Sequence, residues 1–375
     1  MAKASAPRLT ADRVAAFRLA RHHLSRRAPR RALASVVGDV CGVQAQVAAA
    51  ARLSLRARVQ GLTPEDVERA LWRDRTLVKT WAMRGAVHLL PAVELPTYLR
   101  ALARREMRSV GWMTRRGLPM EEIDAIVDAT HAALEGGPLT RRELGARVSK
   151  ALGPRARRWV EHGWGGVVRS ACIRGRVCFG PNRGIEVTFV RLKDWLPRPR
   201  DVPPEEAGAG LLRRFLHVYG PATVQDFARW ADLAAGDARS MWGSVREEIV
   251  QVDVEGRLAW ALRGDLAALR TASLDGPVVR LLPNFDVFLL GHVDKGHLVD
   301  PAHYKRVYRK AGWISQVLLV DGRVAGVWTH RRKGSRLLLA VEPFTPLSRD
   351  VREGVEAEAA DIGRFLGAAC EVTFV

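Results

Sequence analysis

The architecture of this chain can be read from Gly137-Pro138-Leu139-Thr140-Arg141-Arg142-Glu143-Leu144-Gly145, because a related stretch returns as Gly220-Pro221-Ala222-Thr223-Val224-Gln225-Asp226-Phe227-Ala228. In both copies a Gly-Pro pair ends one helix and a Thr caps the next. An acidic residue three positions after the Thr completes a capping box in the first copy and a close variant in the second. An amphipathic helix precedes each copy, at 121–134 and 210–219, so the sequence predicts a repeated unit.

Each copy is followed by another helix and then by a β-hairpin, with strands expected at 177–179 and 185–190 and at 249–254 and 258–262. Near the N-terminus, helices and then strands at 76–81 and 86–90 follow the same order. Helices followed by a hairpin are typical of the winged-helix module. We therefore expect three tandem winged-helix modules, at residues 1–115, 116–200 and 201–268, with a Pro-rich linker at 195–204 between the second and third.

The sequence becomes rich in β-strand patterns after residue 269. Strands are expected at 278–282, 287–290, 316–320, 323–329 and 336–341, and Asp321-Gly322 is a strong hairpin turn. A helix at 348–366 precedes a last strand at 370–375. We expect residues 269–375 to form a small β-barrel or curled sheet beside the helical modules, which makes the fold class α+β.

Composition indicates a polyanionic partner. The 375 residues include 60 Lys and Arg against 40 Asp and Glu, a formal net charge of +20 that is spread along the whole length. Nucleic acid is the first partner such a charge suggests, although a GC-rich genome also enriches a chain in Arg. The four cysteines have neither zinc-ligand nor redox spacing, and we expect no membrane span and no signal peptide. These features predict a cytoplasmic, nucleoid-associated protein.

Gln44 and Gln46 stand two residues apart in a small, apolar run between Val40 and Arg52. In a helix the two amides would point to opposite sides, whereas in an extended segment they share one face. Gly42, just before the pair, favours a break with a helix restarting in the alanine run. Two neutral amides on one face can hold a water or read a base edge, but they cannot act as a strong base. The alternative is a pair of solvated helix residues or a helix-end cap.

Motifs for other kinds of catalysis are missing from the sequence. There is no phosphate loop, no dinucleotide fingerprint and no Gly-X-Ser-X-Gly elbow. His22-His23 and the pair His292 and His297 lack acidic or cysteine partners at ligand spacing, so we expect no metal and no cofactor. Basic clusters offer phosphate contacts, although each could equally be a solvated face. The clusters include Arg115-Arg116, Arg155 to Arg158 and Arg331-Arg332-Lys333.

The chain resembles the AlkZ-like winged-helix alkylpurine DNA glycosylases of the AlkZ/YcaQ superfamily over nearly its full length. Val43-Gln44-Ala45-Gln46 resembles that group's Gln-apolar-Gln catalytic motif, where the YcaQ-like branch has Gln-apolar-Asp. Two departures are Ala86, where Thr is usual, and Val293 and Lys295, where Arg is more frequent. The remaining matching motifs are Thr80 to Leu89, Trp164-Gly165-Gly166, Gly180-Pro181, Tyr219 to Thr223, Leu282 to Asp286 and Val320 to Trp328.

The resemblance implies three winged helices and a β-barrel in a C-shaped, basic cleft around double-stranded DNA containing alkylated purines. It implies excision of N7- or N3-alkylated purines, with interstrand crosslinks or self-resistance to a DNA-alkylating natural product in some members. Gln44 and Gln46 would position the attacking water, and we expect Arg84 and His88 to support them. We expect a monomer. The candidate DNA contacts are Arg52, Arg115, Arg116, Arg157, Arg158, His292, Lys295, Arg331, Arg332 and Lys333.

The chemistry of the residues agrees with this hypothesis. Two amides cannot protonate a leaving base, so the substrate must depart unaided, as a purine made cationic by alkylation does. No lysine lies in the glutamine segment to form a Schiff base, which predicts a monofunctional enzyme. The alternatives are a non-catalytic winged-helix transcriptional regulator and a scaffold for RNA or protein partners. Release of free 7-methylguanine from methylated DNA separates the enzyme from both.

Overall fold

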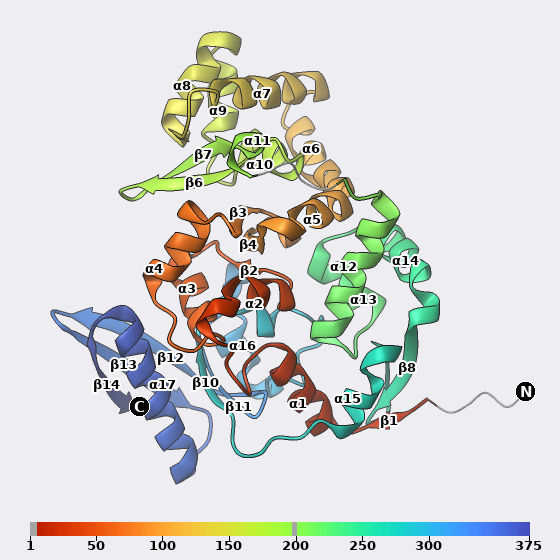
Figure 1. The fold of residues 1–375 in the computed structure, drawn as a ribbon, viewed down its shortest axis with the longest axis vertical. Coiled ribbons are helices and arrows are strands. Elements are labelled where there is room, and N and C mark those ends of the chain that lie inside the picture. The colour runs from red at the N-terminus through yellow and green to blue at the C-terminus, as the bar shows by residue number, and fades with distance from the viewer. Residues whose placement is uncertain (1–5, 197–200) are drawn as a thin grey trace, which may run out of the picture.

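A computed structural model describes residues 6–196 and 201–375. Residues 1–5, and the part of the predicted linker at 197–200, lie outside the described residues. Figure 1 shows three helical units, each with its own small sheet, and a larger curled sheet at the C-terminal end. Each small sheet has three strands and contains one hairpin of the kind predicted, in the orders β2-β4-β3, β5-β7-β6 and β1-β8-β9. Among the described residues no helix is long and apolar enough to cross a membrane.

The first unit places the glutamine run between two helices and against a hairpin. Strand β2 pairs antiparallel with β4, and β4 pairs with β3. Thr63 and Asp66 form a reciprocal capping box at the start of α4. The elements of this unit are α1 (Ala11–Arg21), η1 (Arg30–Ala32), α2 (Leu33–Asp39), β2 (Val43–Gln44), α3 (Ala48–Arg56), α4 (Pro64–Glu68), η2 (Arg69–Arg73), β3 (Leu77–Trp81), η3 (Met83–Gly85) and β4 (Val87–Pro91).

The second unit carries the first copy of the repeated stretch. Thr140 accepts a hydrogen bond from the Glu143 backbone and the Glu143 carboxylate accepts one from the Thr140 backbone, so the predicted capping box is confirmed. The elements are η4 (Ala92–Glu94), α5 (Leu95–Ala101), η5 (Ala103–Arg105), α6 (Glu106–Thr114), α7 (Met120–Ala133), β5 (Leu139–Thr140), α8 (Arg141–Leu152), α9 (Pro154–Val160), α10 (Gly166–Ile173), β6 (Val177–Arg183), β7 (Glu186–Arg191) and α11 (Leu192–Trp195).

The third unit repeats the arrangement, and Thr223 and Asp226 form a complete capping box rather than a variant. The N-terminal strand β1 (Arg8–Leu9) pairs parallel with β8, and Leu9 and Phe17 share a small core with Val252. The first residues therefore pack with the third unit in space. Its elements are α12 (Pro204–Tyr219), α13 (Val224–Ala231), α14 (Ala235–Ser244), η6 (Arg246–Glu248), β8 (Ile249–Val254), β9 (Arg257–Leu262), η7 (Arg263–Asp265) and α15 (Leu266–Thr271).

The C-terminal sheet is curled and open, so the second of the two predicted forms, a curled sheet instead of a barrel, is the one observed. Its order is β10-β11-β12-β13-β14, and its edge strands β10 and β14 do not pair with each other. The expected strand at 287–290 is instead the single turn η8, because the Asp286 carboxylate caps it by accepting from Phe288 N. The elements are β10 (Val279–Leu282), η8 (Val287–Leu289), η9 (Pro301–His303), α16 (Tyr304–Val307), η10 (Lys310–Gly312), β11 (Val317–Val320), β12 (Arg323–Lys333), β13 (Arg336–Pro343), α17 (Arg349–Leu366) and β14 (Ala369–Phe374).

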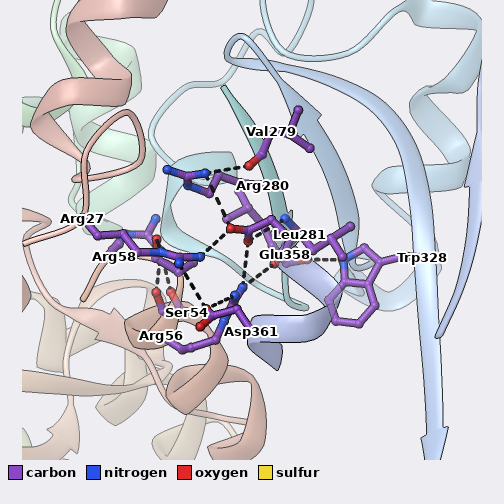
Figure 2. Close-up of polar contacts among 12 residues, drawn as sticks. Arg27, Ser54, Arg56, Arg58, Val279, Arg280, Leu281, Trp328, Glu358 and Asp361 are labelled. Carbon is purple, nitrogen blue, oxygen red and sulfur yellow. Dashed lines mark hydrogen bonds and ion pairs between the residues drawn. The ribbon is translucent and has the colours of Figure 1, made fainter. Parts of the chain in front are cut away.

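A buried ionic cluster joins this sheet to the helix that follows the glutamine pair. Arg56, at the end of α3 and 2% exposed, donates to Glu358 at 3.1 Å and to Asp361 at 2.8 Å on α17. Figure 2 shows Arg27 on the same two acids and Arg280 on Glu358 alone, with the Leu281 backbone beside them. Buried charges are costly unless paired, so this cluster fixes α3 in position against α17.

A candidate active site at the glutamine pair

The backbone around the pair is extended, as Gly42 predicted. Helix α2 ends at Asp39, and Cys41 and Gly42 then have φ of 58° and 85°. A side chain at Gly42 would place its Cβ 2.5 Å from Leu90 Cδ2, so only glycine fits this tight turn. The chain emerges as strand β2, in which Gln44 is the register partner of His88, and Ala45 N donates to Val87 O at 2.7 Å. Gln44 is half-buried and Gln46 is exposed.

Each glutamine is held by a donor from the β3–β4 hairpin. Arg84 Nη2 donates to Gln44 Oε1 at 3.1 Å, and the backbone N of Val87 donates to Gln46 Oε1 at 3.2 Å. Arg84 Nη1 also donates to the Trp230 carbonyl at 2.9 Å, so its guanidinium bridges the first and third units. Burial lowers the pKa of Arg84 to about 10, which leaves it charged at neutral pH.

His88 completes this cluster as a neutral ring. Its Nδ1 lies 3.0 Å from the Ala86 carbonyl, which requires a proton on Nδ1, and its Nε2 lone pair then faces Arg84 Nη2 at 3.4 Å. Burial first, and the charge of Arg84 second, lower the pKa of His88 to about 3. A group that stays neutral across the physiological range cannot protonate a leaving base at that pH.

The two contacts fix which atoms of the amides face outward. Because each oxygen meets a protein donor, each NH2 group points away from that donor. An amide oxygen has two lone pairs, so each still accepts one further hydrogen bond. The pair can therefore accept a proton of a water and donate to its oxygen or to DNA. The structure brings together the four residues predicted for the site, Gln44, Gln46, Arg84 and His88.

The basic residues predicted to contact DNA fall into two groups, those already bonded to other groups of the protein and those that are exposed. Arg52 is paired with Glu68, and Arg157 Nε lies 2.8 Å from Glu161, so these charges are partly neutralised. Arg332 donates to three backbone carbonyls, one in the turn of the β12–β13 hairpin and two at the C-terminal end of α17. The candidates that are exposed are Arg115, Arg116, Arg158, Arg331, Arg332 and Lys333. Their contact with DNA stays a prediction.

Two candidates in the 291–295 segment lie differently from expectation. His292 is 8% exposed, and its Nε2 lies 2.9 Å from both the Tyr219 carbonyl and Arg18 Nη2. Burial also lowers the pKa of His292 well below its usual range, so a cationic contact with phosphate does not fit. Lys295 turns inward to donate to the Leu289 carbonyl at 2.8 Å. The polar groups of His292 and Lys295 thus have protein partners in this structure, and contact of either residue with DNA stays a prediction.

The sequence analysis missed several groups that lie around the glutamine pair but come from distant parts of the chain. The Val87 N–H and the Trp230 carbonyl are backbone atoms, so no residue type signals them. Arg169 of α10 was also missed, although a Cβ on Gly85 would lie 3.2 Å from its Nη1, directly beside the turn that carries Arg84. Only the tertiary packing of the second unit on the first places it there.

Comparison with known proteins places the chain among the DNA glycosylases. A family model described as DNA glycosylase AlkZ-like matches residues 37–365. An interstrand DNA cross-link repair glycosylase of Streptomyces sahachiroi is 37% identical over 369 residues, covering 94% of this chain and 96% of the relative. The solved structure of S. sahachiroi DNA glycosylase AlkZ superposes with a TM-score of 0.84 at 34% identity, over 98% of this chain and 100% of that one. The chain belongs to the AlkZ-like DNA glycosylase family.

Family membership settles the choice between the competing hypotheses in favour of an enzyme. A DNA glycosylase acts on DNA, so the net positive charge has the nucleic-acid partner that composition suggested. The regulator hypothesis is not favoured by the matches. The roles of individual residues are a separate question.

Proposed function

We propose that this protein is a monofunctional glycosylase that hydrolyses the N-glycosidic bond of cationic N7- or N3-alkylated purines in double-stranded DNA. Gln44 and Gln46 would hold the water that attacks C1′ of the sugar. The observation that carries the proposal is the orientation of the two amides by Arg84 and by Val87 N, which leaves hydrogen-bonding capacity on both free for a water.

The reaction needs little acid–base chemistry from the protein. Alkylation gives the purine a positive charge, so the base takes the C1′–N bonding electrons and leaves as a neutral molecule. Positive charge then develops on the sugar, where amide oxygens stabilise it and orient the water. The water forms the new C1′–O bond and loses its proton to solvent. This division of labour explains why two neutral amides and a neutral His88 suffice for charged lesions.

Several finer features belong to the same proposal. The three hairpin sheets support three tandem winged-helix modules, with boundaries near residues 115, 200 and 268, arranged in a C shape around the duplex. The name of the S. sahachiroi relative supports interstrand crosslinks as further substrates, in general repair or in self-resistance. We expect the protein to act as a monomer on chromosomal DNA in the cytoplasm.

The decisive measurement is release of labelled 7-methylguanine from duplex DNA under enzyme excess. Gln46→Ala should lower the single-turnover rate by about 10- to 1000-fold, the effect of losing one or two transition-state hydrogen bonds. Gln46→Glu should retain or raise the rate, because a carboxylate stabilises a cationic sugar better. DNA affinity should change little in either variant, since it comes mainly from phosphate contacts.

A matched control is Gln60→Ala, which removes an exposed glutamine from the same unit, outside the site. It should excise at the wild-type rate. Uracil, a neutral lesion, should remain untouched by every variant. Wild-type excision by a Gln44→Ala, Gln46→Ala double variant would show that this pair is not the active site.

A further inference from the structure

Trp164 is a large aromatic side chain that the fold leaves in solvent. It is 77% exposed, in the loop between α9 and α10. The loop is tightly constrained, because Gly165 and Gly166 have φ of 98° and 46°, and a Cβ on Gly166 would lie 2.1 Å from the Trp159 carbonyl. Trp164 N lies 3.3 Å from His162 Nδ1, to which it donates. The constrained backbone therefore fixes where the Trp164 side chain leaves the loop, and in the structure the indole points into solvent.

The loop packs against the hairpin that holds the glutamine pair. A Cβ on Gly165 would lie 3.1 Å from the Trp81 ring, so this backbone rests on that indole. Trp81 ends strand β3 and is the register partner of Val87, whose N–H donates to Gln46. Two packed contacts thus connect the Trp164 loop to the candidate catalytic amide. Figure 1 shows α10 beside β3.

Cations that form no ion pair flank the loop. Arg169, one turn into α10, is in no ion pair among the described residues, although the charge of Asp232 acts on it from a distance, and its Nε has no hydrogen-bond partner. Its Nη1 lies against Gly85, in the turn that carries Arg84. Arg116 is also without an acidic partner in the described part of the chain and covers the Trp112 ring at 4.3 Å, while Trp112 lies 5.1 Å from His162. An exposed indole beside unneutralised guanidinium groups is complementary to a duplex, whose bases stack and whose phosphates are negative.

We propose that Trp164 stacks on the base pair next to the lesion while Arg169 binds an adjacent phosphate. Inserting an aromatic ring at a base step unstacks it locally, and this costs least where a damaged base already weakens the stack. The inference rests on the proposed function, because it takes the glutamine pair to mark the position of the lesion. It adds a binding element from the second unit to a site built by the first.

The test measures binding without catalysis. Fluorescence anisotropy gives Kd for a duplex containing a stable abasic analogue, which cannot be excised, and for the same duplex undamaged. Trp164→Leu keeps an apolar side chain but loses the flat ring, and should weaken binding to the abasic duplex by about 5- to 100-fold. Trp164→Phe keeps a ring and should stay within about threefold of wild type. Arg169→Gln should reduce the slope of log Kd against log salt by about one.

Oxidation of Trp164 by hydroxyl radicals, read by mass spectrometry, reports the contact directly and should slow several-fold when the abasic duplex is bound. Val93→Ala, which removes an exposed apolar side chain of η4, is the control and should bind as wild type. Unchanged affinity of Trp164→Leu, or unchanged oxidation in the complex, would overturn the proposal, as would an equal loss on damaged and undamaged DNA. Failure of the wild type to release 7-methylguanine would instead reject the proposed function, because none of these readouts requires excision.

Discussion

Arg84 is the residue on which the geometry of the candidate site depends most. Its backbone has φ of 56°, its Nη2 holds Gln44, and its Nη1 reaches the third unit. Arg84→Met should lower single-turnover excision by about 10- to 100-fold, because Gln44 loses the donor that orients it. Arg84→Lys should recover only part of the loss, since an ammonium cannot reproduce the forked guanidinium contacts.

The measurement pairs excision with the midpoint of thermal unfolding, as a purely structural role would move both together. We expect the midpoint of Arg84→Met to stay close to that of wild type, and Arg349→Met, at an exposed position on α17, to alter neither. A fall in the unfolding midpoint that matches the fall in the excision rate would mean that Arg84 stabilises the β3–β4 hairpin and does not act in excision. The same comparison applies to His88, whose Nε2 faces Arg84.

At this scale the sequence predicts the residues better than their contacts. Gly42 correctly predicted the extended backbone at Gln44, because a glycine before a short apolar run favours a break in a helix. The cluster with Arg84 and His88 was also foreseen, since a tight turn keeps its flanks close. The burial of His292 against the Tyr219 carbonyl was not foreseen, because the two residues lie 73 positions apart and no local pattern links them. When a side chain is buried by residues far along the chain, no pattern in the neighbouring sequence predicts it.

Among the elements, the end of α3 and the turn η8 are joined by an ion pair that solvent does not reach. Arg58 and Asp286 are both 0% exposed at the side chain and form two hydrogen bonds, at 2.7 and 2.8 Å. Ser54 donates to the same carboxylate at 2.7 Å, and its backbone carbonyl accepts from Arg58. The pair therefore ties the helix that follows the glutamines to the C-terminal part of the chain.

Asp286→Asn should lower the free energy of unfolding by about 3–5 kcal/mol, because it leaves a buried guanidinium without its counter-charge. Replacing both partners, as Arg58→Met with Asp286→Leu, should cost less than the single change, since no buried charge then remains. Urea unfolding measures both. The exposed pair Arg349 and Glu353 is the control, and Glu353→Gln should cost less than about 1 kcal/mol. A double variant as unstable as Asp286→Asn would contradict the argument.

The predicted helices and strands were correct where residues a few positions apart determine the element, and were wrong or undecided where other contacts do. The capping boxes at Thr140 and Thr223 need only residues three apart, and both form. The sequence left open whether the C-terminal sheet closes into a barrel or stays a curled sheet, because whether β10 meets β14 depends on α17, which packs against both. The run at 287–290 is as apolar as a strand, yet the Asp286 cap turns it into η8.

Across the described part of the molecule, the fold holds four histidines without charge, of which His22, His88 and His292 are buried and His297 is half-buried. Burial lowers the pKa of His88 to about 3 and that of His297 to about 2, and it holds the pKa values of His22 and His292 well below the usual range. Nearby arginines lower the pKa of all four rings further, with Arg84 acting on His88 and Arg18 acting on His22, His292 and His297. A protonated ring in the interior would need a carboxylate beside it to compensate its positive charge. In a chain with 60 basic and 40 acidic residues such carboxylates are scarce, so these rings are uncharged in the folded protein.

This predicts that the protein loses stability on mild acidification. In the unfolded chain the four imidazoles take up protons near pH 6.5, whereas in the folded protein their pKa values lie well below that and the rings stay neutral on mild acidification. The unfolded state therefore binds more protons, and stability present above pH 6.5 is lost as pH falls, by up to about 1.4 kcal/mol per pH unit for each ring. The urea concentration at the midpoint of unfolding should fall from pH 7.5 to 6.5 to 5.5. These pH values lie above the range in which ordinary carboxylates titrate. His297→Gln should give a shallower fall whatever its absolute stability, and equal midpoints at all three pH values would refute the buried neutral rings.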